Sequence, residues 1–408
     1  MQKEHYVGLD IGTSHVRCVI GMYDESGVKN GMPSIIGHGE SINQGMRRGM
    51  IVHVDDVAEA INKAVTEAER LSGIPISHAT VNVNGSQVQG MNSHGVIAIS
   101  AANREITDED RIRVEEAATI VNLPLNREIV QFFAKNYSLD GQKNIKDPVG
   151  MHGVRLEVEA HIVTASTPSL KNQDMALKNA EIRPSHHTVS SLAAAEAVLS
   201  RQQKEAGTAL IDIGAGTTNL IIFEDGEVQH IAVIPIGGQH ITNDLAIGLK
   251  TDLDIAEEVK IQHINLSSDA KKMNAMVKVG SRAHNFKFEE ISMIVEARVE
   301  ELLEFVDKEL QRIKRSRKLP GGIVLTGGGS KLPGITDFTR EKLQLAARLA
   351  KLEGVGGLID TVDDQSYIPV VGLMLLDMLL LPALPPISLD NKTNAKKIFS
   401  KLFLRDKK

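Results

Sequence analysis

Cysteine and tryptophan are almost absent from this sequence of 408 residues, which has one Cys, no Trp, four Tyr and nine Phe. The lone Cys18 excludes an internal disulfide and suits a reducing compartment. It lies in the alternating run VRCVIGMY, which is typical of a strand, so we expect a buried structural thiol and not a nucleophile. Because aromatics are scarce, the apolar 42% is mostly Ile, Val, Leu and Ala, a composition typical of helices on a buried sheet.

A long hydrophobic run is missing as well. The start, MQKEHYVGLDIG, has no apolar stretch long enough for a signal peptide, so secretion is not expected. The most apolar segment contains Asp377 and runs for only 14 residues, from Ile368 to Leu381, whereas a membrane span needs about 20. We therefore expect a buried helix that closes a domain. The length of the chain predicts about two to four compact units.

A repeat is the main positive signal. The segments VGLDIGTSHVRCVIG and ALIDIGAGTTNLIIF share the order apolar strand, Asp, Gly, Thr or Ser, apolar strand. Their aspartates, Asp10 and Asp212, are 202 residues apart, about half the chain. This spacing predicts a duplicated pair of similar domains that face each other.

Each turn of the repeat has the residue types that bind phosphate. Glycine lets backbone N–H groups approach phosphate oxygens, and hydroxyls add donors. The residues concerned are Gly12, Thr13, Ser14, Gly214, Gly216, Thr217 and Thr218. Asp10 and Asp212 would then flank a polyphosphate and suit a hydrated Mg²⁺. One such hairpin alone would be weak support, because Asp-x-Gly turns are common in strands that bind nothing.

A third element strengthens the prediction of a nucleotide site. The segment GGIVLTGGGSKLPGI is a buried strand that ends in three glycines, Gly327, Gly328 and Gly329, followed by Ser330. A tight strand-to-helix turn rarely needs three glycines, so we expect close approach to a planar ligand. Two phosphate turns and this glycine turn predict a nucleotide cleft between two domains.

In this order the three elements resemble the actin-like ATPase superfamily. The segments GMRRGMIVHVDDVAEAINKAVTEAE, SLDGQKNIKDPVGMHGVRLEVEAHIVT, SSLAAAEAVL and IPIGGQHITNDLAIGL narrow the resemblance to the FtsA family of bacterial cell-division proteins, over nearly the whole chain. The most specific part is an inserted domain, because actin and the chaperone relatives place their extra subdomain elsewhere. Within it, DGQKNIKDPVGMHG is expected to be a loop.

The resemblance implies an α/β chain with the actin-like fold, in which two similar domains surround a nucleotide cleft. The implied boundaries are 1–83, 162–192 and 358–384 for the first domain, 84–161 for the inserted domain, 193–357 for the second domain with a smaller part at 228–300, 385–393 for a linker, and 394–408 for a C-terminal amphipathic helix.

The resemblance also implies ATP and Mg²⁺ as ligands and assigns roles to site residues. Asp10 through Ser14 and Asp212 through Asn219 would form the two phosphate clasps, with Mg²⁺ bound to both aspartates through water. Glu196, in AAAEAVL, would position the attacking water, although taken alone it would be explained as a solvated helix residue. The residues implied to contact adenosine are Gly327, Gly328, Gly329 and Ser330, with Glu257 and Lys260 on a helix that covers the base.

The chain ends in a basic, apolar segment, NAKKIFSKLFLRDKK. It has six Lys or Arg and one Asp, a surplus of five positive charges on a chain of net charge -6, so the remainder carries -11. On a helix, one apolar stripe is flanked by cations. The stripe is Ile398, Phe399, Leu402 and Phe403, and the cations include Lys396, Lys397, Lys401 and Arg405. Such a helix lies in a membrane interface and gains roughly 1 kcal/mol per cation near anionic lipid.

The tail is also compatible with a disordered solubilising segment or with a helix that docks on its own protein. Disorder should not place two Phe, an Ile and two Leu within seven residues. Membrane binding is therefore the favoured interpretation.

The implied function is an ATP-binding protein that polymerises on the cytoplasmic side of the cell membrane at the septum, tethers FtsZ filaments and recruits later division proteins, with at most slow ATP hydrolysis. One alternative is a peptide-binding pilus-assembly ATPase like PilM, which predicts no membrane tail. Another is a small-molecule kinase, for which no acceptor motif is found. Basic residues outside the tail are scattered among acids, so nucleic acid binding is not expected.

Overall fold

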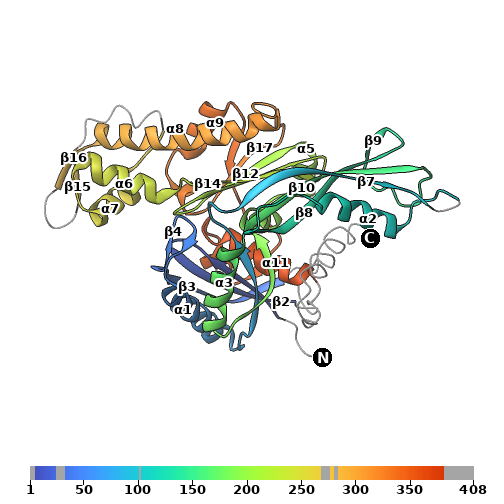
Figure 1. Cartoon of the computed structure of the whole chain (residues 1–408). Coiled ribbons are helices and arrows are strands. Elements are labelled where there is room, and N and C mark those ends of the chain that lie inside the picture. The colour runs from blue at the N-terminus through green and yellow to red at the C-terminus, as the bar shows by residue number, and fades with distance from the viewer. Residues whose placement is uncertain (1–4, 24–32, 101–102, 268–275, 280–283, 381–408) are drawn as a thin grey trace.

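Two mixed β-sheets of the same plan form the two halves of the molecule (Figure 1). The structure, a computed structural model, describes residues 5–23, 33–100, 103–267, 276–279 and 284–380. The strand orders are β11-β6-β1-β2-β3-β19 and β14-β13-β12-β17-β18. In each sheet three consecutive strands form an antiparallel meander, and a later strand lies parallel to the first of them. This is the duplicated plan that the repeat predicts.

The first half is assembled from three separate stretches of chain. Its strands are β1 (His5–Ile11), β2 (His15–Tyr23), β3 (Pro33–Ile42), β6 (His78–Val83), β11 (Arg183–Val189) and β19 (Gly356–Gly357), and its helices are α1 (Val54–Ser72), α3 (Thr167–Asn179), α4 (Ser190–Val198), α10 (Ile359–Val362) and α11 (Ile368–Leu379). Helix α1 buries Val57, Ile61 and Ala64 at helical spacing against the sheet. It ends at Gly73, whose φ of 70° is the left-handed conformation that glycine adopts easily.

Helix α11 is the buried helix that the sequence predicts. It packs so closely on β1 that a Cβ on Gly8 would lie 2.3 Å from the carbonyl oxygen of Val370. The carboxylate of Asp377 accepts hydrogen bonds from the Val7 N–H (3.0 Å) and the Thr80 hydroxyl (2.6 Å), so this charge in an apolar helix is satisfied. Within the described residues, no helix combines the length and the apolarity that crossing a membrane requires.

The inserted domain has its own sheet, in the order β7-β10-β8-β9, and its own core. Its elements are β7 (Gln89–Ala98), α2 (Asp108–Thr119), β8 (Arg127–Leu139), β9 (Gln142–Ile145) and β10 (Arg155–Ser166). The prediction of a loop over residues 140–153 was wrong in its first part, because β9 lies there. Asp140 and Gly141 have φ values of 48° and 89°, so this Asp-Gly pair forms a tight hairpin turn that returns the chain as β9.

The second half contains α8, the longest helix of the described residues, which buries Ile291, Val295, Val299 and Leu302 on one face at the predicted spacing of three and four residues. Its strands are β12 (Thr208–Ile213), β13 (Thr218–Glu224), β14 (Glu227–Ile234), β15 (Met276–Val279), β16 (His284–Lys287), β17 (Gly322–Thr326) and β18 (Ala347–Leu349), and its helices are α5 (Arg201–Ala206), α6 (Gly238–Leu249), α7 (Leu253–His263), α8 (Phe288–Arg312) and α9 (Ile335–Leu343).

Figure 1 shows the inserted domain at one side of the molecule and α6, α7 and the β15–β16 pair at the opposite side, with α11 near the centre. The predicted linker 385–393 and amphipathic helix 394–408 lie outside the described residues. The residue boundaries of the domains stay predictions.

Candidate functional site

The two turns of the repeat meet between the halves of the molecule. A Cβ on Gly216 would lie 2.8 Å from the Thr13 hydroxyl oxygen, so the turns touch where only glycine fits. Both turns have the same internal hydrogen bond: the Gly12 N–H donates to the His15 carbonyl (3.0 Å), and the Gly214 N–H to the Thr217 carbonyl (2.9 Å). The fold therefore brings together two motifs from opposite halves of the chain.

Asp10 and Asp212 occupy equivalent positions near the ends of β1 and β12, and both are buried. Asp10 accepts a hydrogen bond from the Asn82 amide (2.6 Å) and Asp212 from the Asn219 amide (2.9 Å). Burial raises the pKa of Asp10 to about 7, and the charge of Asp212 raises it further while Arg17 opposes both effects. Burial also raises the pKa of Asp212, against the hydrogen bond from Asn219 and the charge of Arg17. Two buried like charges are unfavourable until a cation compensates them.

These donors fit a hydrated magnesium ion. Mg²⁺ is bound in proteins by one or two carboxylates together with waters and substrate phosphates. In the part of the chain that the structure describes, no group of three or more His, Cys, Asp or Glu could hold a metal. A Mg²⁺ ion held by Asp10 and Asp212 would therefore need water and phosphate to complete its coordination.

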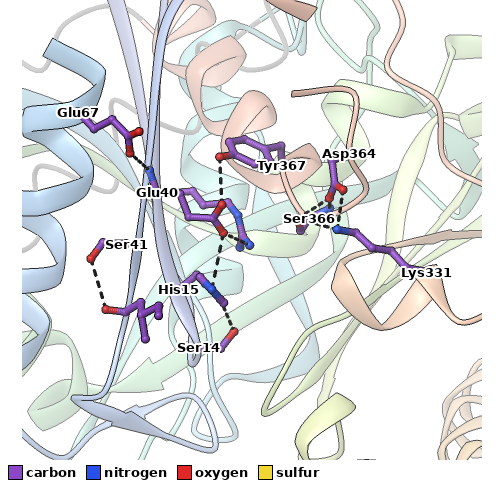
Figure 2. A network of polar contacts seen from close by, with 11 residues as sticks. Ser14, His15, Glu40, Ser41, Glu67, Lys331, Asp364, Ser366 and Tyr367 are labelled. Atoms are coloured by element: carbon purple, nitrogen blue, oxygen red, sulfur yellow. Dashed lines mark hydrogen bonds and ion pairs between the residues drawn. The ribbon is translucent and has the colours of Figure 1, made fainter. Parts of the chain in front are cut away.

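A permanent cation, Arg17, lies beside the two aspartates. The β1–β2 register places Arg17 directly opposite Asp10. Its guanidinium is 2.5 Å from Glu40 Oε1 and 5.3 Å from the centre of the Tyr367 ring. Figure 2 shows the Tyr367 hydroxyl directed at the same Glu40 carboxylate, at 3.3 Å. The place of Arg17 at this site was not predicted from the sequence. The signal that could have shown it is the tight turn between the two strands, which places residue 17 across from residue 10.

The hydroxyls expected to bind phosphate all have protein partners in this structure. Thr218 donates to the Ile236 carbonyl (2.8 Å), Thr217 to the Asn84 side chain (3.4 Å), and Thr13 accepts from the Gly49 N–H (3.1 Å). The Ser14 hydroxyl lies 3.0 Å from His15 Nδ1 (Figure 2). These contacts hold the turns in shape, and direct contact of the hydroxyls with phosphate stays a prediction.

The three consecutive glycines differ in what surrounds them. Gly327 has a φ of 82°, and a Cβ there would lie 2.3 Å from Asp212 Oδ1. A Cβ on Gly329 would lie 2.3 Å from the Ile213 side chain, whereas a Cβ on Gly328 would meet nothing within 4 Å. The Ser330 hydroxyl is buried and donates to the Gly327 carbonyl (2.8 Å). Two of the glycines are thus required for packing on β12, and Gly328 borders open space.

Glu257 and Lys260 connect α7 to the second turn. Lys260 Nζ lies 2.6 Å from Glu257, 2.9 Å from the Thr242 hydroxyl and 3.4 Å from the Gly238 carbonyl. The Gly238 N–H in turn donates to the Gly214 carbonyl (2.9 Å). This pair is therefore part of a continuous polar network that reaches the second turn of the repeat.

Glu196 has a different partner from the one its predicted role requires. Lys204 of α5 donates to its carboxylate at 2.7 Å. The residue of α4 that contacts the aspartate pair is Ser190, whose side chain hydrogen-bonds Asp212. The contact of Ser190 was not predicted from the sequence. The signal that could have indicated it is the position of Ser190 at the junction between a strand and the helical segment SSLAAAEAVL. Water positioning by Glu196 stays a prediction.

Comparison with solved structures identifies the class of protein. The chain is similar to the PilM–PilN type IV pilus biogenesis complex (TM-score 0.65, 18% identity, 91% of this chain and 98% of that chain). It is also similar to MreB5 of Spiroplasma citri bound to ADP (TM-score 0.53, 14% identity, 92% of this chain and 96% of that chain). Together with the paired sheets and facing turns, these likenesses confirm the actin-like ATPase fold that the resemblance implied.

Sequence comparison then identifies the family: the chain belongs to the FtsA family of cell division proteins. It is 39% identical to cell division protein FtsA of Bacillus subtilis, over 91% of this chain and 83% of that protein. It is 34% identical to the FtsA of Pseudomonas aeruginosa, over 90% of this chain and 88% of that protein. The models of cell division protein FtsA and of the SHS2 domain inserted in FtsA match residues 209–372 and 85–164. The protein is thus an actin-like cell-division protein.

Proposed function

We propose that the protein binds ATP with Mg²⁺ in the cleft between its two halves. The observation that carries this proposal is the buried pair Asp10 and Asp212, whose pKa values burial raises even with Arg17 beside them, and which lies beside two touching glycine turns. MreB5, which shares the fold, has been solved with ADP and with AMPPNP, and this supports a nucleotide in such a cleft.

Each part of the cleft would hold one part of the ligand. Backbone N–H groups of the two turns would hold phosphate oxygens, and Mg²⁺ when bound would neutralise charge on both the phosphates and the aspartates. The open space next to Gly328 would admit the nucleoside. Glu257 and Lys260 would support the helix that covers the base.

Nucleotide titration tests this proposal. The full chain should bind ATP only with Mg²⁺ present, and Asp212→Asn should weaken binding by about tenfold or more, because one of two ligands for the metal loses its charge. Asp337→Asn is the matched control, because the Asp337 side chain is 63% exposed on α9. Equal ATP affinity of wild type and Asp212→Asn would contradict the proposed site.

The same protein would polymerise on the cytoplasmic side of the membrane at the septum, tether FtsZ filaments and recruit later division proteins. Membership of a cell-division family supports a role with these partners. The apolar stripe and cations of residues 394–408 support attachment to anionic lipid. One short helix binds reversibly, so stable attachment would need many copies joined in a polymer.

Co-sedimentation with phosphatidylglycerol vesicles tests the anchor. The full chain should pellet with vesicles and carry FtsZ with it, whereas a chain that ends at Asn391 should stay in the supernatant. Phe399→Glu should also abolish pelleting, because it places a charge in the apolar stripe. Ser400→Glu adds the same charge on the polar side of the predicted helix and should reduce pelleting less. Equal pelleting of the full and shortened chains would refute the anchor.

The PilM-like role in peptide binding for pilus assembly, which the sequence left open, is set aside. The PilM–PilN complex shares only the fold, at 18% identity, whereas division relatives are up to 39% identical in sequence. Failure of the full chain to bind FtsZ with or without ATP would refute the tethering of FtsZ proposed here.

A further inference from the structure

A short hairpin reaches into the site and is not used by the proposal above. Strands β4 (Met46–Arg47) and β5 (Met50–Ile51) are joined by the two-residue turn Arg48–Gly49. Both turn residues are left-handed, with φ values of 50° and 74°. Asn, Asp or Gly normally occupies the first of these positions, and an arginine adopts this conformation only at a cost in free energy. A non-glycine residue held in a strained conformation at a candidate site raises the question of what its side chain does there.

The tip of this hairpin contacts both phosphate turns. The Gly49 N–H donates to the Thr13 hydroxyl of the first turn at 3.1 Å. A Cβ on Gly216 in the second turn would lie 3.1 Å from the Cα of Arg48. The backbone of Arg48 is therefore held against the place where the two turns meet, and its side chain begins there.

The charge of Arg48 acts on a residue in the other half of the molecule. Its side chain is exposed, and it belongs to the first half of the molecule. Burial lowers the pKa of His240 on α6, in the second half, and the positive charges of Arg298 and Arg48 lower it further. The charge of Arg298 is paired with Asp244 at 2.5 Å. Within the described residues, by contrast, Arg48 forms no ion pair with a carboxylate, so its charge is available to an anion.

The position of the hairpin determines which end of a bound nucleotide would lie near Arg48. The second turn has two ends: Gly327 of the glycine turn packs on Asp212, and Arg48 packs on Gly216. A nucleotide whose nucleoside lies toward Gly328 would extend its phosphates along this turn toward Arg48. The phosphate nearest Arg48 would be the terminal one.

We propose that Arg48 contacts the terminal phosphate of bound ATP and so makes the site prefer ATP over ADP. This inference rests on the proposed nucleotide site. Arginine suits the task because its planar guanidinium donates two hydrogen bonds to one phosphate and stays charged at any physiological pH.

The test compares ATP and ADP affinities, each with Mg²⁺, for the full chain and its variants. Arg48→Gly is the main variant, because glycine adopts the left-handed turn without strain and the hairpin should keep its shape. It should weaken ATP binding by about 10- to 100-fold, the loss of hydrogen bonds to a charged group, and ADP binding by less than about threefold. Arg48→Lys should retain part of the preference for ATP. Arg47→Ala, at the exposed neighbour, should change neither affinity.

The outcomes separate this inference from the proposed function. If wild type binds ATP and Arg48→Gly keeps the same ratio of ATP to ADP affinity, the role of Arg48 is refuted while the nucleotide site stands. If Arg48→Gly weakens both nucleotides equally, Arg48 supports the turns and does not select the terminal phosphate. If wild type binds neither nucleotide, both proposals fail. An unchanged urea midpoint of Arg48→Gly confirms that the comparison is between folded proteins.

Discussion

The imidazole of His161, in the inserted domain, accepts a hydrogen bond from the backbone N–H of Ile231, in the second half, with Nε2 3.0 Å from that nitrogen. The other ring nitrogen lies 2.9 Å from the side-chain oxygen of Asn92, so Nδ1 carries the proton. The ring is buried and packs edge-on against His230, which is paired with Glu309 of α8 at 2.8 Å. A domain inserted into the first half of the chain is therefore joined to the second half.

Replacing His161 should destabilise the protein. His161→Phe keeps the ring but leaves the buried Ile231 N–H without its acceptor, which costs about 1–3 kcal/mol in the free energy of unfolding. Urea denaturation measures this loss. His94→Phe is the control, because the His94 side chain on neighbouring β7 is 49% exposed and should change stability by less than about 0.5 kcal/mol. Equal losses in the two variants would show that the hydrogen bond contributes nothing.

The same histidine predicts how stability depends on pH. Burial lowers the pKa of His161 from 6.5 to about 3, and the charges of His230 and Lys135 act in the same direction. Below pH 6.5 the unfolded chain gains a proton that the folded protein does not, so stability falls as the pH decreases toward 3. His161→Phe lacks this effect. The gap in unfolding free energy between wild type and His161→Phe should therefore narrow by about 2 kcal/mol from pH 7 to pH 5. A constant gap would contradict this assignment.

The raised pKa of Asp10 predicts the opposite dependence of stability on pH. Its pKa is raised from 3.8 to about 7, so its contribution to stability is fully present below pH 3.8 and is lost as the pH rises to 7. Asp10→Asn carries no charge and can still accept from Asn82. Without ligand it should be more stable than wild type at pH 8, by about 2–4 kcal/mol, and the difference should vanish near pH 4. Thermal unfolding across this range measures the difference. MgATP should raise the midpoint of wild type much more than that of Asp10→Asn, and the reverse order would refute the role of this carboxylate.

The glycine turn offers two substitutions with different expected effects. Gly327→Ala places a Cβ 2.3 Å from Asp212 Oδ1 in a left-handed residue, so it should lower the unfolding free energy by about 2 kcal/mol or more. Gly328→Ala meets nothing within 4 Å and should leave stability unchanged, but its methyl group should weaken ATP binding by occupying the open space. Urea unfolding and ATP titration on both variants separate the two roles. Loss of stability in Gly328→Ala would show that it too is a packing glycine.

Glu196 and Lys204 allow the predicted water-positioning role to be separated from an ion pair. Both Glu196→Gln and Lys204→Met remove the pair that joins α4 to α5. If Glu196 positions water, Glu196→Gln alone should slow ATP turnover at saturating ATP, by about 100-fold or more, as expected for loss of an acid–base group. Lys204→Met should keep the turnover of wild type. Equal turnover in both variants would assign Glu196 to the ion pair only.

Much of the fold follows from local patterns. The alternation of apolar residues around Asp10 and Asp212 and the helical spacing in α8 depend only on near neighbours in the chain, so they could be predicted correctly. Strand β9 was missed because its segment was interpreted as a loop despite the Asp140–Gly141 turn signal. The meeting of the two glycine turns was also predicted from the sequence, because the same Asp-x-Gly pattern occurs in two similar segments half a chain apart.

The rest of the site could not be predicted, because it depends on contacts between residues far apart in the chain. That Arg17 lies opposite Asp10, or that Ser190 and not Glu196 reaches Asp212, follows from register and helix orientation, which no local pattern encodes. By itself the sequence determined the class of fold, the duplicated turns and the basic tail, because these arise from residue types and their spacing. Only the tertiary structure decided which glycine borders open space and which arginine of the described residues remains without a carboxylate partner at the turns. It also decided how His161 joins the inserted domain to the second half. These features depend on distances between segments far apart in the chain, and close packing sets those distances.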